Sequence, residues 1–317
     1  MFTPKLEILP RAQRRLWDEL RQTPEEFVLY GGTALALRLG HRQSEDFYFF
    51  SNVSFAPDSL RKRVQCMQGA EVSQSEANTL TVIVHRDGPV KISFLGGLNL
   101  NRVQDPDVTP DNEIQVASKL DVAATKLATI QQRAQARDYE DLAAIVGAGI
   151  SLGEALGAAA AAYGKEFNGA LSLKALTYFG DGDLPNLSPA TQTKLRALAG
   201  QVNFNQNSAD ASKNRRDATQ RRSEMNHPEL QTVAKRVVWF KAPDDALKDV
   251  KLFLAHVMTY GTLGDITTTL RYFSEDDFEA VLHDPPAGVF DRRSWTYWNV
   301  RYRHHPVSSL PKRTLPL

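Results

Sequence analysis

The stretch from Leu29 to Phe50 reads LYGGTALALRLGHRQSEDFYFF, and it decides the fold of the first part of the chain. Its apolar opening ends at the glycine pair Gly31-Gly32, which predicts a short strand that turns directly into a helix. The helix is expected over residues 34–39, where the next glycine stops it. A second strand is expected over residues 46–50. The stretch is therefore a strand, a glycine turn, a helix and another strand.

This glycine turn has the features of a phosphate-binding site. Glycine lets the backbone approach a ligand, and the free amide groups at the start of a helix bind phosphate oxygens. A glycine pair alone more often reflects plain turn geometry, but Arg42, Ser44 and Asp46 follow closely here. Residues 46 and 48 share one face of the second strand, where two carboxylates could jointly hold Mg²⁺. This chain supplies Asp46 and Tyr48 at those positions.

Outside this stretch, the chain divides into regions of different composition. Helical spacing, a hairpin and short strands predict a small α+β sheet at the start, and helical patterns dominate afterwards. Residues 201–228 are polar and charged and cannot bury a core, which indicates a linker. The expected segments are an α+β core at 1–111, a helical subdomain at 112–200, a flexible linker at 201–228, an all-helical domain at 229–305 and a tail at 306–317.

The composition excludes several classes of protein. The chain has 317 residues, of which 42% are hydrophobic, so disorder throughout and small disulfide scaffolds are excluded. A single cysteine, Cys66, cannot form an internal bridge, and neither a signal peptide nor a membrane anchor is visible, so we expect a cytoplasmic protein. A net charge of +1 gives no general bias toward nucleic acid.

Two motifs, one in the stretch quoted above and one later in the chain, match the pattern of a known family. The family's first motif is matched by residues 31–35 and then by Arg42, Ser44, Asp46 and Phe50. Its second motif is matched by residues 123–127, then Arg133, then the run Arg-Asp-Tyr-Glu-Asp-Leu at 137–142. The chain from about residue 27 to residue 198 resembles the AbiEii/AbiGii nucleotidyltransferases, the toxins of many bacterial toxin–antitoxin and phage-defence pairs. The resemblance implies a polymerase-β-like nucleotidyltransferase fold that uses a nucleoside triphosphate and Mg²⁺ to modify an RNA, such as a tRNA, or a protein.

The resemblance also implies roles for individual residues. Asp46 is the metal ligand, with Tyr48 at the position of the family's second carboxylate. Lys126 neutralises charge on the phosphates, and Asp138 orients or deprotonates the acceptor. The nucleotide-binding residues are Gly31, Gly32, Thr33, Arg42 and Ser44, and the supporting residues are Arg133, Arg137 and Asp141.

Structural interpretations of the same residues stay open from the sequence. An exposed lysine is the default on a helix such as the one that carries Lys126. Asp138 and Asp141 often pair with Arg137 or cap a helix, and Arg42 and Ser44 could simply shape the turn. His41 is expected to be a loop residue without a role.

Tyr48 departs from the family pattern. One anchor for Mg²⁺ is lost, and the strand that should carry a third acidic residue offers Ser93 instead. One carboxylate and the triphosphate oxygens can hold the ion, but positioning of the reacting oxygens would suffer. We therefore expect a weak or inactive enzyme, in which Tyr48 is either a natural change or a detoxifying substitution.

The segment at 229–305 resembles the small antitoxin encoded beside such toxins. A helix is expected from Pro243 to Gly261, a capping box at Ser274, and a last helix capped by Asp291. Trp239, Trp295 and Trp298 are expected in its core. These features suggest a fusion of a toxin with its neutralising domain, docked on the toxin and kept at high effective concentration by the linker.

Two other functions remain open. The chain could be an inactive enzyme that binds nucleotide or RNA as a sensor, or a sugar or antibiotic nucleotidyltransferase with the same fold. His85, His256 and His283 lack the spacing of zinc ligands, so no metal is assigned to them. His304-His305 offers at most a weak adventitious metal contact.

Overall fold

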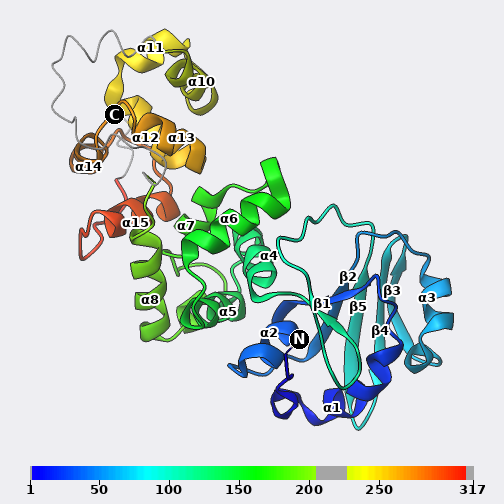
Figure 1. Ribbon diagram of the computed structural model, residues 1–317. Coiled ribbons are helices and arrows are strands. Elements are labelled where there is room, and N and C mark those ends of the chain that lie inside the picture. The colour runs from blue at the N-terminus through cyan, green and yellow to red at the C-terminus, as the bar shows by residue number, and fades with distance from the viewer. Residues whose placement is uncertain (1, 205–226, 312–317) are drawn as a thin grey trace. The chain divides into compact units, whose positions relative to one another are not determined.

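The computed structural model describes residues 2–204 and 227–311. The chain forms two compact units, Met1–Phe167 and Asn168–Leu317 (Figure 1). Residues 205–226, most of the expected linker, and residues 312–317 of the expected tail lie outside the described residues.

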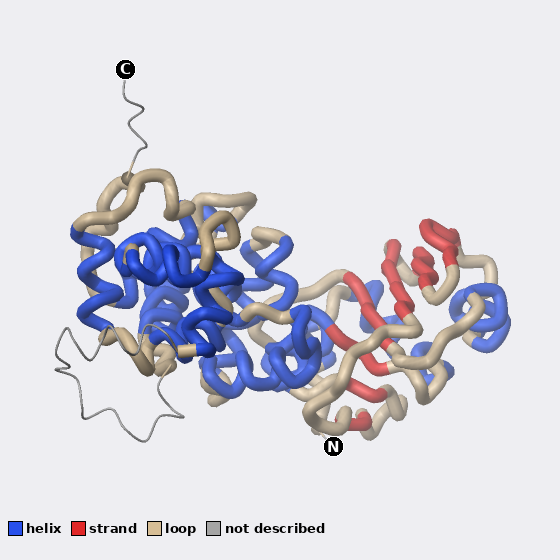
Figure 2. Tube along the Cα trace, turned by 90° about the horizontal axis from the view of Figure 1, so that it is seen from above, coloured by secondary structure: helices blue, strands red, loops and turns tan. Residues whose placement is uncertain are grey.

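The first unit is built on a mixed sheet of seven strands in the order β3-β4-β5-β2-β1-β7-β6. Figure 2 draws the strands in red. The strands are β1 (Val28–Tyr30), β2 (Asp46–Phe50), β3 (Glu71–Glu76), β4 (Thr79–His85), β5 (Pro89–Leu95), β6 (Asp107–Val108) and β7 (Gln115–Val116). The predicted strand pair and hairpin are confirmed, with β1 antiparallel to β2 and β4 antiparallel to β5. Strand β2 also runs parallel to β5, which places it in the middle of the sheet.

Strand β3 was not predicted. Its sequence, Glu-Val-Ser-Gln-Ser-Glu, is exposed at every position because it forms an edge of the sheet. The strand therefore lacks the alternation of apolar and polar residues that marks a half-buried strand.

Helices pack on this sheet and on one another. The first three are α1 (Arg11–Trp17), α2 (Gly31–Leu39) and α3 (Pro57–Arg63), followed by α4 (Lys119–Gln132), α5 (Ala136–Gly147) and α6 (Leu152–Tyr163). Helix α4 packs against α2, α5 and α6, so it connects the sheet region to the two helices that follow. The predicted helix at 34–39 is confirmed, and it starts earlier, at the glycine pair itself.

The second unit is entirely helical in its described residues. It contains α7 (Gly169–Ala175), α8 (Pro189–Gly200), α10 (Pro228–Val237), α11 (Pro243–Lys248), α12 (Val250–Tyr260), α13 (Leu263–Thr269), α14 (Glu275–His283) and α15 (Arg292–Arg301). The capping box at Ser274 and the cap at Asp291 are confirmed. The single helix expected from Pro243 is two helices, because Asp249 caps a new one by accepting a hydrogen bond from the Leu252 amide.

The boundary between the units differs from the expected boundary at residue 200. Helices α7 and α8 pack against α15 in the second unit. The Trp298 indole donates to the Met258 carbonyl at 2.8 Å, and the Phe204 ring lies 6.4 Å from that indole. Residues on both sides of the expected linker therefore share one core.

Trp295 and Trp298 are buried as expected, but Trp239 is not. Its side chain is 65% exposed and contacts the rings of Phe240 and Tyr260. The expectation of three core tryptophans is therefore wrong for Trp239, which lies just beyond the end of α10.

No single helix within residues 2–204 and 227–311 is long and apolar enough to cross a membrane. Helices α5 and α6 reach that length and apolarity only together, and the chain bends by 117° between them.

Candidate functional site

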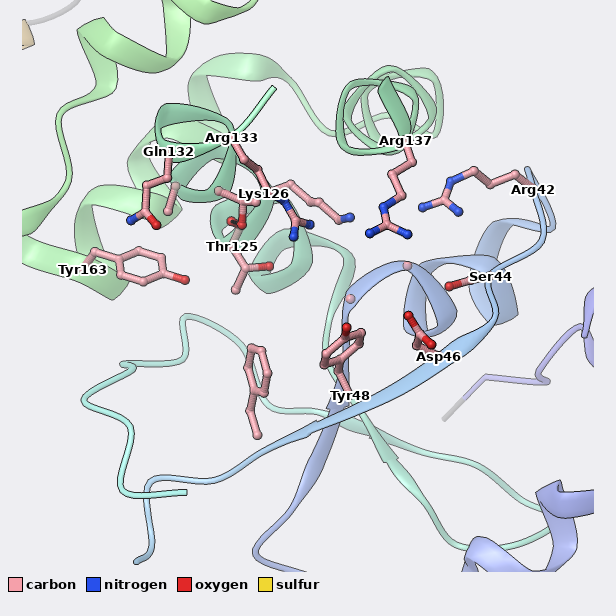
Figure 3. A pocket seen from close by; sticks show the side chains of 15 residues that line it. Arg42, Ser44, Asp46, Tyr48, Thr125, Lys126, Gln132, Arg133, Arg137 and Tyr163 are labelled. Carbon is pink, nitrogen blue, oxygen red and sulfur yellow. Dashed lines mark hydrogen bonds between the residues drawn. The ribbon is translucent and has the colours of Figure 1, made fainter. Parts of the chain in front are cut away.

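One pocket of the first unit gathers most of the residues that the sequence singled out (Figure 3). Its volume is about 450 Å³, and we call it the Asp46 pocket. It is lined by Gly31, Gly32, Arg42, Ser44, Asp46, Tyr48, Phe50, Thr125, Lys126, Ala128, Thr129, Gln132, Arg133, Arg137 and Tyr163. These residues come from the start of α2, from the loop before β2, from β2, from α4 and the residue after it, from the start of α5 and from the end of α6.

The start of α2 forms one wall of the pocket. Gly31 has φ +77°, a conformation that residues with a side chain rarely adopt. A Cβ atom at Gly32 would lie 2.8 Å from Arg42 Nη2 and 2.9 Å from Ser44 Oγ. Only glycine lets these two side chains lie directly over the helix start. The N-cap residue Tyr30 makes no capping bond with its side chain, so the first amide groups of α2 remain available to an anion.

Strand β2 forms the floor of the pocket. Asp46, Tyr48 and Phe50 are half-buried and line the pocket, whereas Phe47 and Phe49 between them are fully buried in the core. This alternation confirms the predicted shared face of residues 46 and 48. Within the described part of the chain, the Asp46 carboxylate has no hydrogen bond or ion pair.

The carboxylates available for Mg²⁺ are few. Among the described residues, Asp46 is the one acidic residue that lines the pocket. Tyr48 lies beside Ser93 in the parallel register of β2 and β5, and the buried Ser93 hydroxyl lies 3.1 Å from that of Thr81. The three positions where carboxylates were sought therefore hold one. This donor set fits a single ion whose remaining ligands are phosphate oxygens and water molecules.

Lys126 faces the floor from α4 and is not an exposed lysine. Its side chain is 8% exposed. The Nζ atom donates to Asp138 Oδ1 at 2.7 Å and lies 2.5 Å from Asp141 Oδ2. Two buried carboxylates of α5 thus fix the ammonium group at the wall of the pocket.

Asp141 also holds the residues of the loop before β2. It accepts a bidentate pair of hydrogen bonds from Arg42, at 2.7 and 2.8 Å, and lies 2.8 Å from His41 Nε2. Burial alone would raise the pKa of the Asp141 carboxyl. The hydrogen bonds from His41 and Arg42 and the charge of Lys126 outweigh burial and hold that pKa well below its ordinary value. His41 is therefore a partner of the network, contrary to the expectation that it has no role.

Asp138 plays the same part for Arg133. It accepts hydrogen bonds from Arg133 at 2.8 and 3.2 Å in addition to the one from Lys126. Burial opposes ionisation, but Arg133 and Lys126 together lower the pKa of Asp138. A fully buried carboxylate held by two cations fits a positioning role. It does not fit the role of a base, which the sequence analysis gave to Asp138.

Arg137 completes a group of four cations over the floor. Its Nε donates to Gln135 Oε1 at 3.2 Å, and no carboxylate among the described residues pairs with it. Figure 3 shows the guanidinium groups of Arg137 and Arg42 directed toward the same space above Ser44 and Asp46. The expected pairing of Arg137 with Asp138 or Asp141 is therefore replaced by an arginine that faces the pocket.

Most of the predicted site residues meet in this pocket, and three lie beside it. Thr33, Asp138 and Asp141 are fully buried. The Thr33 hydroxyl donates to the Asp46 carbonyl oxygen at 2.5 Å, so it ties α2 to β2 and does not bind phosphate directly.

Other lining residues were missed by the sequence analysis. Phe50, Gln132 and Tyr163 line the pocket, and Figure 3 shows Gln132 and Tyr163 at the end away from Arg42 and Arg137. Burial raises the pKa of Tyr163 to about 12. Alternation along β2 could have identified Phe50, whereas Tyr163 comes from the end of α6 and only the packing of α6 on α4 brings it there.

Comparisons with known proteins identify the family of the chain. The family described as "Nucleotidyl transferase AbiEii toxin, Type IV TA system" matches residues 15–229 of the chain. The "Uncharacterized protein aq_aa25" of Aquifex aeolicus (strain VF5) is 34% identical over 117 residues. That alignment covers 37% of this chain, and the chain spans 56% of the length of that relative.

Proposed function

Because the chain belongs to the AbiEii family, the nucleotidyltransferase toxins of type IV toxin–antitoxin systems, we propose that the Asp46 pocket binds a nucleoside triphosphate for transfer of its nucleotide to an RNA or protein acceptor. The acceptor would form a bond to the α-phosphate, and the bond to the β-phosphate would break with release of pyrophosphate. The observation that carries this proposal is the meeting of four cationic side chains and one free carboxylate around the start of a helix. Triphosphate recognition needs cations and backbone amides together, and the pocket offers both.

The cations suit a phosphate chain because they are held in place before it binds. Asp138 and Asp141 fix Arg42, Lys126 and Arg133 through buried ion pairs. The two carboxylates do not neutralise the three cations completely, so the pocket keeps a positive charge, to which Arg137 adds. Preorganised charges of this kind stabilise negative charge that develops on a phosphoryl group during transfer.

Mg²⁺ would be held by Asp46 together with phosphate oxygens, and it would supply further charge neutralisation. The protein's own contribution is to bind and orient the triphosphate. The Ser44 hydroxyl and the first amides of α2 offer hydrogen bonds beside the Arg42 guanidinium.

The opposite end of the pocket suits a nucleobase. Phe50 also lines the pocket, and its ring stacks on the Tyr30 ring with the centroids 4.9 Å apart. A base can stack on such a surface, and the Gln132 amide and Tyr163 hydroxyl offer hydrogen bonds to its edge.

We infer that Tyr48 weakens the enzyme. Its phenol occupies the floor next to Asp46, where a second carboxylate would help to fix the metal and the reacting oxygens. Replacement of this residue by aspartate should therefore raise the rate.

The proposal is tested by incorporation of labelled nucleotide into total RNA and protein. The unmodified protein should give a low rate, Tyr48→Asp a higher rate and Asp46→Asn none. Tyr48→Phe is the matched control, since it keeps the ring and adds no carboxylate. Transfer that survives Asp46→Asn would contradict the proposed site.

The single free carboxylate also favours a second function, that of an inactive enzyme that senses nucleotide or RNA. In that case nucleotide would bind in the Asp46 pocket and no label would be transferred, even by the Tyr48→Asp variant.

We also propose that the segment at 229–305 is a neutralising domain. The family match ends at residue 229, near the start of α10. Helix α15 follows the matched residues and packs on α7 and α8, which belong to them. Lys174 of α7 donates to the Thr259 carbonyl of α12 at 2.6 Å.

If the chain is expressed as two pieces, 1–205 and 225–317, we expect them to copurify. Expression of the first piece alone, with Tyr48→Asp, should arrest growth, and failure of the second piece to relieve the arrest would contradict a neutralising role.

A further inference from the structure

We propose that Glu279, His283 and His304 of the second unit form a binding site for a divalent transition-metal ion of the Zn²⁺ type. The proposal is independent of the Asp46 pocket and of the proposed function. One ligand atom from each of the three residues lies within 4.8 Å of the other two. Spacing along the chain had excluded His283 as a metal ligand and allowed only a weak contact at His304, because the three ligands do not follow a zinc-binding spacing.

Two of the ligands are placed by helix geometry. Glu279 and His283 are four residues apart on α14, so their side chains project from the same face one turn apart. The third ligand follows α15. His304 Nε2 lies 2.9 Å from Glu279 Oε1, and the ring centroids of His304 and His283 are 5.3 Å apart.

These separations fit a small ion with little adjustment. A tetrahedral ion with bonds of 2.0–2.2 Å holds its ligand atoms about 3.4 Å apart. The observed separations, from 2.9 Å to at most 4.8 Å, lie on both sides of that value. Modest rotation of the partly exposed side chains is sufficient to close them around an ion.

Contacts outside the cluster hold His304 over α14. Glu275, one turn before Glu279, accepts hydrogen bonds from Arg301 at 2.6 Å and from the Tyr302 hydroxyl at 2.5 Å. The His304 amide donates to the Asn299 carbonyl at 2.9 Å, which folds the chain back toward the helix. Deeper in the unit, the rings of Phe278 and Trp298 pack with centroids 5.5 Å apart. The third ligand is therefore positioned by the folded protein and does not depend on the ion.

The donor set selects the class of metal. Two imidazoles and one carboxylate suit Zn²⁺ and similar borderline ions, whereas Mg²⁺ and Ca²⁺ prefer oxygen ligands alone. Three protein ligands leave a fourth position for water. Bound metal would connect the segment after α15 to the end of α14 and stabilise the second unit.

The test is titration of the full-length, chelator-treated protein with Zn²⁺ alone by calorimetry, in millimolar Mg²⁺ to mask oxygen-rich sites. We expect one Zn²⁺ per chain, visible absorption of four-coordinate metal when Co²⁺ replaces it, and a thermal midpoint that rises with Zn²⁺ and falls again with chelator. His283→Ala and Glu279→Gln should each weaken binding roughly tenfold or more and remove the rise in midpoint.

The matched control is His305→Ala, because His305 is the neighbour of His304 in the sequence but lies outside the cluster. His283 is exposed, so His283→Ala tests the site even if a change at His304 impairs folding. Binding that is unchanged in His283→Ala and Glu279→Gln, or weakened equally by His305→Ala, would mark Zn²⁺ as an adventitious ion only and overturn the proposal.

Discussion

The Nζ atom of Lys126 lies 2.5 Å from Oδ2 of Asp141, and this buried contact joins α4 to α5 at the wall of the Asp46 pocket. The same carboxylate binds Arg42 from the loop before β2. One aspartate therefore sets the positions of two cations that come from distant parts of the sequence. Asp141 therefore affects both the positive charge of the pocket and the stability of the first unit.

Loss of the Asp141 charge should destabilise the protein strongly. In Asp141→Asn, Arg42 and Lys126 lose much of the charge that compensates their burial, and breaking a buried ion pair costs about 3–5 kcal/mol. Denaturant unfolding of the wild type and of Asp141→Asn measures the difference in their unfolding free energies. Asp46→Asn is the control, because the Asp46 carboxylate has no partner among the described residues, and its unfolding free energy should stay within about 0.5 kcal/mol of the wild-type value. An Asp141→Asn protein as stable as Asp46→Asn would contradict the coupling.

Gly32 should be intolerant of even a methyl group. The added Cβ would lie 2.8 Å from Arg42 Nη2 and 2.9 Å from Ser44 Oγ, so Gly32→Ala must displace both side chains from the start of α2. We expect triphosphate affinity to fall roughly tenfold or more, since small misplacements of binding groups are costly.

Gly157→Ala is the matched control for this change. Gly157 lies within α6, and a Cβ there has no neighbour within 4 Å. This variant should keep its affinity and gain about 0.5–1 kcal/mol of stability from better helix propensity. Equal affinities in the two alanine variants would contradict the role of Gly32.

Lys174 should give the second unit a specific pH dependence. Burial lowers the pKa of Lys174 to about 8 from an ordinary 10.5, although the charge of Asp291 opposes the shift. Between these two values the unfolded chain binds more protons than the folded one, so stability rises with pH. The destabilisation is present in full below pH 8 and is relieved as the pH approaches 10.5, by roughly 3 kcal/mol in total.

Lys174→Met removes this titration. The unfolding free energy of the wild type should rise relative to that of Lys174→Met between pH 8 and 10.5, as followed by tryptophan fluorescence. Lys235→Met, at an exposed position of α10, should follow the wild type. Parallel curves for the wild type and Lys174→Met would contradict the shift.

Much of the sheet could be predicted from local patterns. Alternating residues define β2 and its pocket face, and Gly31-Gly32 marks the turn into α2. Strand β3 could not be predicted in this way, because an exposed edge strand carries no apolar alternation. The split between α11 and α12 depends on a side-chain cap at Asp249, which the apolar pattern does not reveal.

The sequence predicted most residues of the candidate site but not the ion pairs and helix packing that hold them together. Spacing placed Lys126 on a helix, but its burial follows from carboxylates on the next helix, and only the packing of α4 on α5 brings them together. Tyr163 joins the site because α6 packs on α4, and Gln132 joins it because α4 packs on α2. The cluster of Glu279, His283 and His304 likewise depends on the contact between α14 and α15.

The most direct test of the account is equilibrium binding of each of the four nucleoside triphosphates, with Mg²⁺, to the full chain and to Arg137→Ala. Arg137 faces the pocket without a carboxylate partner among the described residues, so its replacement should not unfold the protein. Loss of its charge-assisted hydrogen bond to the triphosphate should weaken binding roughly tenfold or more. Arg21→Ala, at an exposed position outside the pocket, should bind as the wild type does. At least one triphosphate should bind, and of the two variants Arg137→Ala alone should bind it more weakly. No binding of any triphosphate, or equal binding by all three proteins, would rule out the Asp46 pocket as a triphosphate site.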